Sequence, residues 1–88
     1  MLELGQLFAT PGALEAFQTN QQTPLEFIQR HLNHDWGDLD DHDKHENDYS
    51  AEHGLRILSA YRLKDGTRIW IITEADRSST TVLLPSEY

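Results

Sequence analysis

The chain has 88 residues, and its 15 acidic and seven basic residues give it a net charge of −8. A chain of this length buries only about 60–65% of its extended surface, so we expect one small domain with a thin core. The absence of cysteine excludes disulfides and thiolate metal clusters. The amino-terminal residues lack the basic region of a signal peptide, and no apolar run approaches ~18 residues. We therefore expect a cytoplasmic protein without a membrane segment.

The charge is distributed unevenly along the chain. Residues 1–53 contain eleven acidic and two basic residues, whereas residues 54–88 contain four acidic and five basic ones. We expect the first part to be an acidic helical region and the second to be a β-meander. An acidic surface repels phosphate and attracts basic protein surfaces. The composition therefore disfavours direct nucleic-acid binding and favours a basic protein partner.

Two Thr-Pro pairs predict helix starts, because threonine caps a helix amino terminus and proline is tolerated at the first helical position. The first helix begins at Thr10-Pro11, and Asn20 can end it in a left-handed conformation. The second runs from about Pro24 to Asn33, with Glu26 placed to complete a capping box. The side chains that we expect these two helices to bury are Ala13, Leu14, Phe17, Leu25, Phe27, Ile28 and Leu32.

A third helix is predicted in the acidic region. It begins near Asp40, with Asp38 or Asp40 as its amino-terminal cap, and it ends at Gly54. Its interior is poor in helix-forming apolar residues. The side chains that it can bury are Leu39, Tyr49 and Ala51.

Three runs rich in β-branched and aromatic residues predict an antiparallel sheet: Leu55–Leu63, Thr67–Thr73 and Thr80–Leu84. The Asp-Gly pair between the first two runs is a strong hairpin signal. A three-residue loop would place Tyr61 opposite Ile69, whereas a two-residue loop would place it opposite Trp70. Both registers leave apolar residues on each face of the hairpin, so something besides the helices must shield the second face.

The expected fold class is therefore α+β, in one domain over residues 1–88. Two or three amino-terminal helices pack on a three-stranded antiparallel meander. A fourth, edge strand can come from Leu4–Ala9 at the amino terminus.

Four segments of the chain resemble a family of small bacterial proteins known as plasmid-related proteins, which occur on plasmids and other mobile elements. The segments are Ala9–Leu14, Asp35–Leu39 (DWGDL), Ile57–Tyr61 (ILSAY) and Ile69–Ser78 (IWIITEADRS). The resemblance extends from Gly5 to the terminal residues PSEY. It implies an accessory role on a mobile element, and it implies neither a reaction nor a cofactor.

All five histidines lie between residues 31 and 53, interleaved with carboxylates. His31 and His34 are three residues apart, as are His42 and His45, which is a spacing that places two metal ligands on one helix face. The alternative is a solvated polar surface. No zinc-protease or zinc-finger spacing is present, so we expect no metal site and no cofactor.

The acidic stretch has two interpretations. It is either a solubilising helix face or a partner-binding face that imitates the phosphate spacing of DNA. Trp36 in the same stretch is either a core anchor or an aromatic contact at the interface. The partner-binding residues would be Asp35, Trp36, Asp38, Asp40, Asp41, Asp43, Glu46 and Asp48.

The loop after the second predicted strand is an alternative site, because carboxylates, a guanidinium and hydroxyls could hold an anion or transfer protons. Its residues are Glu74, Asp76, Arg77, Ser78, Ser79 and Thr80. The competing interpretation is an ordinary connection. There Asp76 and Ser78 bond the loop backbone, and Arg77 pairs with a carboxylate.

We therefore expect a non-catalytic, acidic accessory protein of a mobile element that acts by binding a basic protein of the host or of the element. Inhibition of a host defence or nucleic-acid enzyme is one form of this function. The alternative is a small enzyme or ligand-binding protein that uses the Glu74–Thr80 loop.

Overall fold

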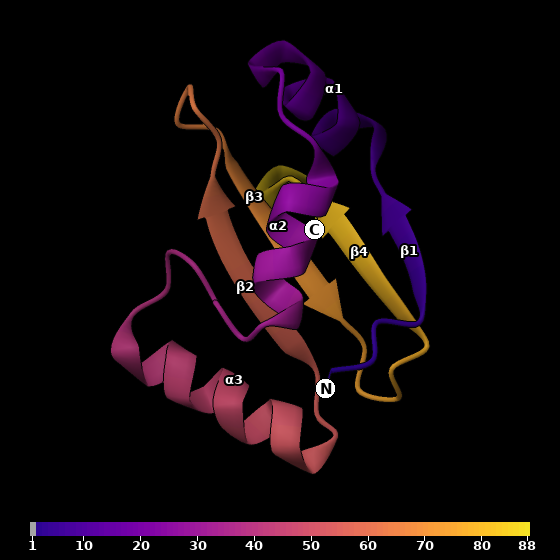
Figure 1. The fold of residues 1–88 in the computed structure, drawn as a ribbon, viewed down its shortest axis with the longest axis vertical. Helices are drawn as coiled ribbons and strands as arrows, with labels where there is room; N and C mark the ends of the chain where they lie inside the picture. Colours follow the sequence, from indigo (N-terminus) through magenta and orange to yellow (C-terminus); the bar gives the residue numbers. More distant parts are fainter. Residues whose placement is uncertain (1) are drawn as a thin grey trace.

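The computed structural model describes residues 2–88, which form helices packed on a mixed four-stranded sheet (Figure 1). This confirms the α+β class. The elements in chain order are β1 (Gln6–Ala9), α1 (Pro11–Asn20), α2 (Pro24–Leu32), α3 (Asp41–His53), β2 (Ile57–Arg62), β3 (Arg68–Thr73), β4 (Ser79–Leu83) and the 3-10 turn η1 (Pro85–Glu87). Within residues 2–88, no helix is long and apolar enough to cross a membrane.

The sheet has the strand order β1-β4-β3-β2. The strands β2, β3 and β4 form the predicted antiparallel meander. The amino-terminal strand is also present, but it pairs parallel with β4 and starts at Gln6 rather than at Leu4. Gly5 precedes it with a φ of 64°, a left-handed conformation that suits glycine. The first and last strands of the chain are therefore neighbours.

The β2–β3 hairpin adopts the register of the three-residue loop, with Tyr61 opposite Ile69. The backbone N–H of Leu63 donates to the carbonyl of Thr67 at 2.9 Å, which closes the hairpin around Lys64-Asp65-Gly66. Gly66 has a φ of 88° and donates its own N–H to the Leu63 carbonyl at 2.9 Å. A left-handed glycine at this position is what this loop type requires. Of the two registers that the sequence allowed, the structure selects this one.

Helices α1 and α2 cover one face of the sheet and form the main core with it (Figure 1). Its centre is aromatic: the ring centroids of Phe17 and Phe27 are 5.8 Å apart, and those of Phe27 and Tyr61 are 5.4 Å apart. Such tilted pairs add about 0.5–1.5 kcal/mol to the burial of the rings. The other core residues are Ala13, Ile28, Leu63, Ile69, Ile71 and Val82.

Several details of these two helices differ from the expectation. Leu14 and Leu25 are 49% and 57% exposed, so they lie outside the core. Gln21, rather than Asn20, ends α1 in the left-handed conformation, with a φ of 54°. At the start of α2, no side-chain cap hydrogen bond forms, so the expected capping box with Glu26 is absent. Glu26 instead accepts a hydrogen bond from a neighbouring glutamine.

His31 is the polar centre of the helix–sheet interface and is fully buried. Its Nδ1 lies 2.5 Å from the Ser59 hydroxyl on β2, and its Nε2 lies 2.8 Å from the Thr73 hydroxyl on β3. Thr73 in turn contacts the Thr80 hydroxyl on β4 at 2.8 Å, and Thr80 donates to the Leu4 carbonyl at 2.8 Å. One imidazole thereby connects α2 with three strands and with the segment before β1.

The far end of this chain of hydrogen bonds determines the state of the ring. A carbonyl can only accept, so the Thr80 proton is committed to Leu4, and Thr73 must donate to Thr80. His31 must then donate from Nε2. Because burial keeps the ring neutral at pH 7, Nδ1 accepts the Ser59 proton. Burial is the main cause that lowers the pKa of His31 to about 4, and the nearby His34 and Arg77 lower it further.

The carboxyl-terminal residues contact the face of the sheet opposite α1 and α2, and they also contact the start of α1. The rings of Trp70 and Tyr88 pack edge to face with centroids 5.7 Å apart, which partly shields that face as expected. The Glu87 carboxylate accepts from the Thr10 hydroxyl at 2.5 Å and from the Gly12 N–H at 3.2 Å. A carboxylate at a helix amino terminus is favoured by the helix dipole. These bonds, with the Thr10 hydroxyl foremost, lower the pKa of Glu87.

The depressed pKa of His31 predicts a stability that falls in mild acid. Above pH 6.5, which is about the pKa of His31 in the unfolded chain, the imidazole is neutral in both the folded and the unfolded chain. Between pH 6.5 and pH 4 only the unfolded chain protonates it. The free energy of unfolding should therefore drop by about 2 kcal/mol between pH 7 and pH 5. Urea titrations at the two pH values measure this. His31→Gln should abolish the difference whatever its own stability, whereas His42→Gln, at an exposed position on α3, should retain it. An equal pH dependence in all three proteins would contradict this assignment.

Candidate partner-binding surface

The segment before α3 attaches the acidic region to the sheet. Gly37 forms a parallel bridge with Ala60: the Ala60 N–H donates to the Trp36 carbonyl at 3.2 Å, and the Asp38 N–H donates to the Ala60 carbonyl at 2.6 Å. A Cβ at Gly37 would lie 2.1 Å from that carbonyl, so only glycine permits this approach. The segment therefore covers the outer edge of β2.

Trp36 belongs to the core. It is 3% exposed and packs with Leu2 and Ile57 in a second hydrophobic cluster beside α3. Its indole N–H donates to the Asp48 carboxylate at 2.9 Å, and the His34 ring stacks on it at 5.0 Å. Because its ring is enclosed, Trp36 is not available as the aromatic contact of a partner-binding face. The core-anchor interpretation is the one that the structure supports.

Four of the predicted partner-binding carboxylates have roles inside the molecule. Asp48 accepts from Trp36, and Asp40 caps α3 by accepting the Asp43 N–H at 2.8 Å, as predicted. Asp35 pairs with Arg30 at 2.7 Å, and Asp38 pairs with Arg62 at 2.8 Å. The hydrogen bond from the paired arginine is the main cause that lowers the pKa of each of these two carboxyl groups.

The inner side of α3 is attached by polar contacts. Asn47 and Ser50 are its buried residues. The Asn47 amide donates to the Leu58 carbonyl at 2.7 Å and accepts the Leu58 N–H at 3.4 Å, so it acts as a further hydrogen-bonding edge for β2. Tyr49, which we expected to be buried, is 54% exposed. The helix is placed by an amide and by the indole bond, with little apolar burial.

The remaining acids of α3 are exposed, as is the Tyr49 ring. The Tyr49 ring stacks on His53 with centroids 4.0 Å apart and planes 8° apart. Within residues 2–88, Asp41, Asp43 and Glu52 form no side-chain ion pair, and Glu46 has only a 3.9 Å contact with His42. We define the acidic face of α3 by the residues Asp41, Asp43, Glu46, Tyr49, Glu52 and His53.

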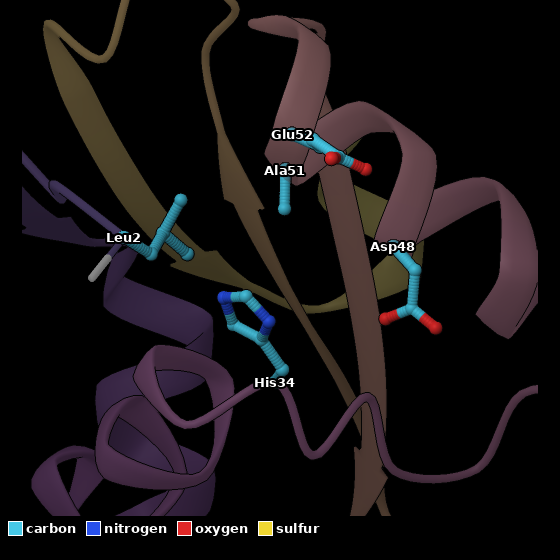
Figure 2. A pocket seen from close by; sticks show the side chains of 5 residues that line it. All are labelled: Leu2, His34, Asp48, Ala51 and Glu52. Carbon is cyan, nitrogen blue, oxygen red and sulfur yellow. The ribbon is translucent and has the colours of Figure 1, made fainter.

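A pocket of about 430 Å³ adjoins the acidic face. Figure 2 shows the His34 imidazole projecting between Leu2 and the α3 residues Asp48, Ala51 and Glu52. His34 itself has a left-handed φ of 62°. The pocket brings an imidazole and two carboxylates to one hollow. Among residues 2–88, however, no cluster of three or more His, Asp or Glu side chains has the arrangement to hold a metal ion.

The Glu74–Thr80 loop uses its polar groups within the molecule. The Arg77 guanidinium donates to the carbonyls of Leu55 at 2.7 Å and of Ser50 at 3.0 Å, and it also contacts those of Glu74 and Ala75. It thus holds the carboxyl end of α3 against the sheet, with carbonyls as partners rather than the carboxylate that we expected. Asp76 accepts the Ser78 N–H at 3.0 Å, as the ordinary-connection interpretation predicts.

The other residues of that loop do not converge on an open site. Glu74 lies 3.6 Å from Arg56. Ser79 is the first residue of β4, and Thr80 is buried in the His31 network. Glu74, Arg77 and Thr80 therefore have partners in different parts of the molecule and do not face one common site. The Arg77 guanidinium, which would bind an anion, is occupied by backbone carbonyls.

The contacts of Arg77 predict a structural role for its guanidinium. Arg77→Lys should lower the free energy of unfolding by about 1–3 kcal/mol, because an ammonium cannot reach the same set of carbonyls. Chemical denaturation of the purified variant measures this. Arg68→Lys, at an exposed position on β3, serves as the control and should be neutral. Unchanged stability in Arg77→Lys would contradict this role and would support the alternative, in which the guanidinium is free to bind an anion.

Comparisons of the chain with protein-family models, with curated proteins and with solved structures gave no match. The likeness to plasmid-related proteins therefore stays a prediction from the sequence segments alone.

Proposed function

We propose that the protein is a non-catalytic binding factor whose acidic face of α3 docks on a basic surface of another protein. The partner class is a host or element-encoded protein with a basic groove that ordinarily holds nucleic acid. Occupying such a groove would inhibit the partner. The choice of a nucleic-acid enzyme rests on the resemblance to plasmid-related proteins, and the choice of surface rests on the residues of α3.

The observation that supports this surface best is the exposed Tyr49–His53 stack among carboxylates. Tyrosine is enriched at the energetic centres of interfaces, because a rigid ring gives a large contact area at a low entropic cost. Here the ring is more than half exposed, although β2 and the second core lie directly behind the helix. The sequence left Trp36 as either a core anchor or the aromatic contact. Because Trp36 is buried, the proposal takes the exposed Tyr49 as the aromatic contact.

The electrostatics support the same surface. Within residues 2–88, Asp41, Asp43 and Glu52 have no arginine or lysine in an ion pair to compensate their charges. The first two lie in the opening turn of α3, where the helix dipole partly compensates them. A basic partner would compensate the remaining charge and would be attracted from a distance, which raises the association rate.

This proposal predicts the effect of neutralising the free acids only. Asp38 and Asp40 must be spared, because one pairs with Arg62 and the other caps α3. A variant with D41N, D43N and E52Q should fold normally and should associate with the partner about ten-fold more slowly at low salt. The partner is first isolated by co-purification from the bacterial host and identified. Its association rate with the purified chain is then measured at two salt concentrations.

Two further variants distinguish docking at the acidic face of α3 from a general effect of net charge. E3Q, E15Q and E26Q together remove three exposed acids that lie outside α3 and change the net charge equally. This control should bind almost as fast as the parent. Tyr49→Ser should instead raise the dissociation rate, since it removes contact area rather than charge. If both triple variants slow association equally, the acidic face of α3 has no special role, and the proposal fails.

A further inference from the structure

We propose that β1 is a self-association site, at which two copies of the chain pair antiparallel along their open sheet edges. The site is independent of the acidic face of α3. Among residues 2–88, β1 has β4 as its one neighbouring strand. Its sequence QLFA carries no charge, and its two large side chains, Leu7 and Phe8, are 53% and 51% exposed. A strand edge without lysine, proline or a bulge is a template for pairing.

The backbone groups that face outward follow from the pairing with β4. The N–H groups of Gln6 and Thr10 donate to the carbonyls of Ser78 and Val82, so the residues with even numbers point their backbone groups at β4. Leu7 and Ala9 therefore point their N–H and carbonyl groups away from the sheet. Two copies related by a two-fold axis can join Leu7 of each with Ala9 of the other, which forms four hydrogen bonds.

This register places Phe8 of one copy directly opposite Phe8 of its partner. They form a non-hydrogen-bonded pair, in which the two Cα atoms lie about 4.5 Å apart and the side chains are closest. In each chain Phe8 lies in the same row as Thr81 and Ile72, on the sheet face away from α1 and α2. The two rings would cover each other on that face, and Leu7 would contact Ala9 of the partner on the other.

The charge distribution identifies the occupant as a second copy. Figure 1 shows β1 and α3 at opposite sides of the molecule. Three strand spacings, about 14 Å, separate β1 from β2, and α3 lies beyond β2; this exceeds the Debye length of about 8 Å at physiological salt. In the paired form the two acidic helices lie at the far ends of an eight-stranded sheet. This arrangement brings two strongly acidic chains together at their uncharged edges.

Cysteine cross-linking tests the pairing directly, because the chain has no cysteine of its own. Phe8→Cys places two thiols at a Cα separation that a disulfide spans. Under mild oxidation it should give a covalent dimer in high yield. Leu25→Cys, at an exposed position on α2, should not. Equal cross-linking of both variants, or of neither, would overturn the proposal.

Sedimentation equilibrium gives a second readout on the chain without cysteine. The parent should approach twice the monomer mass as its concentration rises to a few hundred micromolar. Leu7→Lys should weaken the dimer at least ten-fold, whereas Leu25→Lys, the same change at a leucine of similar exposure, should leave it intact. Circular dichroism confirms that each variant is folded. A parent that stays monomeric over this range, or a Leu7→Lys variant that associates as well as the parent, would contradict self-pairing at β1.

Discussion

The position of α2 depends on the hydrogen bonds of His31. A neutral imidazole in an apolar interface is costly unless both ring nitrogens are satisfied, and here the strands supply one donor and one acceptor at fixed places. The hydroxyls of Ser59 and Thr73 lie on neighbouring strands, so the ring fits between them in one orientation only. The helix that carries the ring is held in a single rotation and height over the sheet.

That rotation explains the exposure of Leu25. At about 100° per residue, a helix face centred on His31 also presents Phe27 and Ile28 to the sheet, whereas Leu25 lies roughly a third of a turn away. The apolar spacing alone suggested a face through Leu25, Ile28 and Leu32. The observed face is turned toward the histidine, because losing the ring's hydrogen bonds to the buried Ser59 and Thr73 hydroxyls would cost more than exposing one leucine.

The parts of the fold that sequence reasoning predicted well are those with local causes. The Thr-Pro helix starts, the hairpin loop and the end of α3 at Gly54 each depend on residues close together in the chain. What the sequence left open has distant causes. The parallel direction of β1 depends on β4, some seventy residues later, and the role of Trp36 as a core anchor depends on its packing with Leu2 and Ile57 and on its bond to Asp48. For the candidate site, the sequence indicated the acidic helix. Which aromatic residue is exposed, Tyr49 or Trp36, could be decided only from their tertiary contacts.

The contact between the first and last strands has a consequence for how the chain folds. Residues 6–9 cannot pair until residues 79–83 are available. Thr10 caps α1 locally by accepting the Ala13 N–H, and Glu87 adds a carboxylate to that helix start. During synthesis β1 therefore cannot pair until β4 has been made, whereas the β2–β3 hairpin can close by itself. Contacts of such large sequence separation slow folding and make it cooperative. Removing a few residues at the carboxyl terminus would thus first affect the start of α1, near the opposite end of the chain.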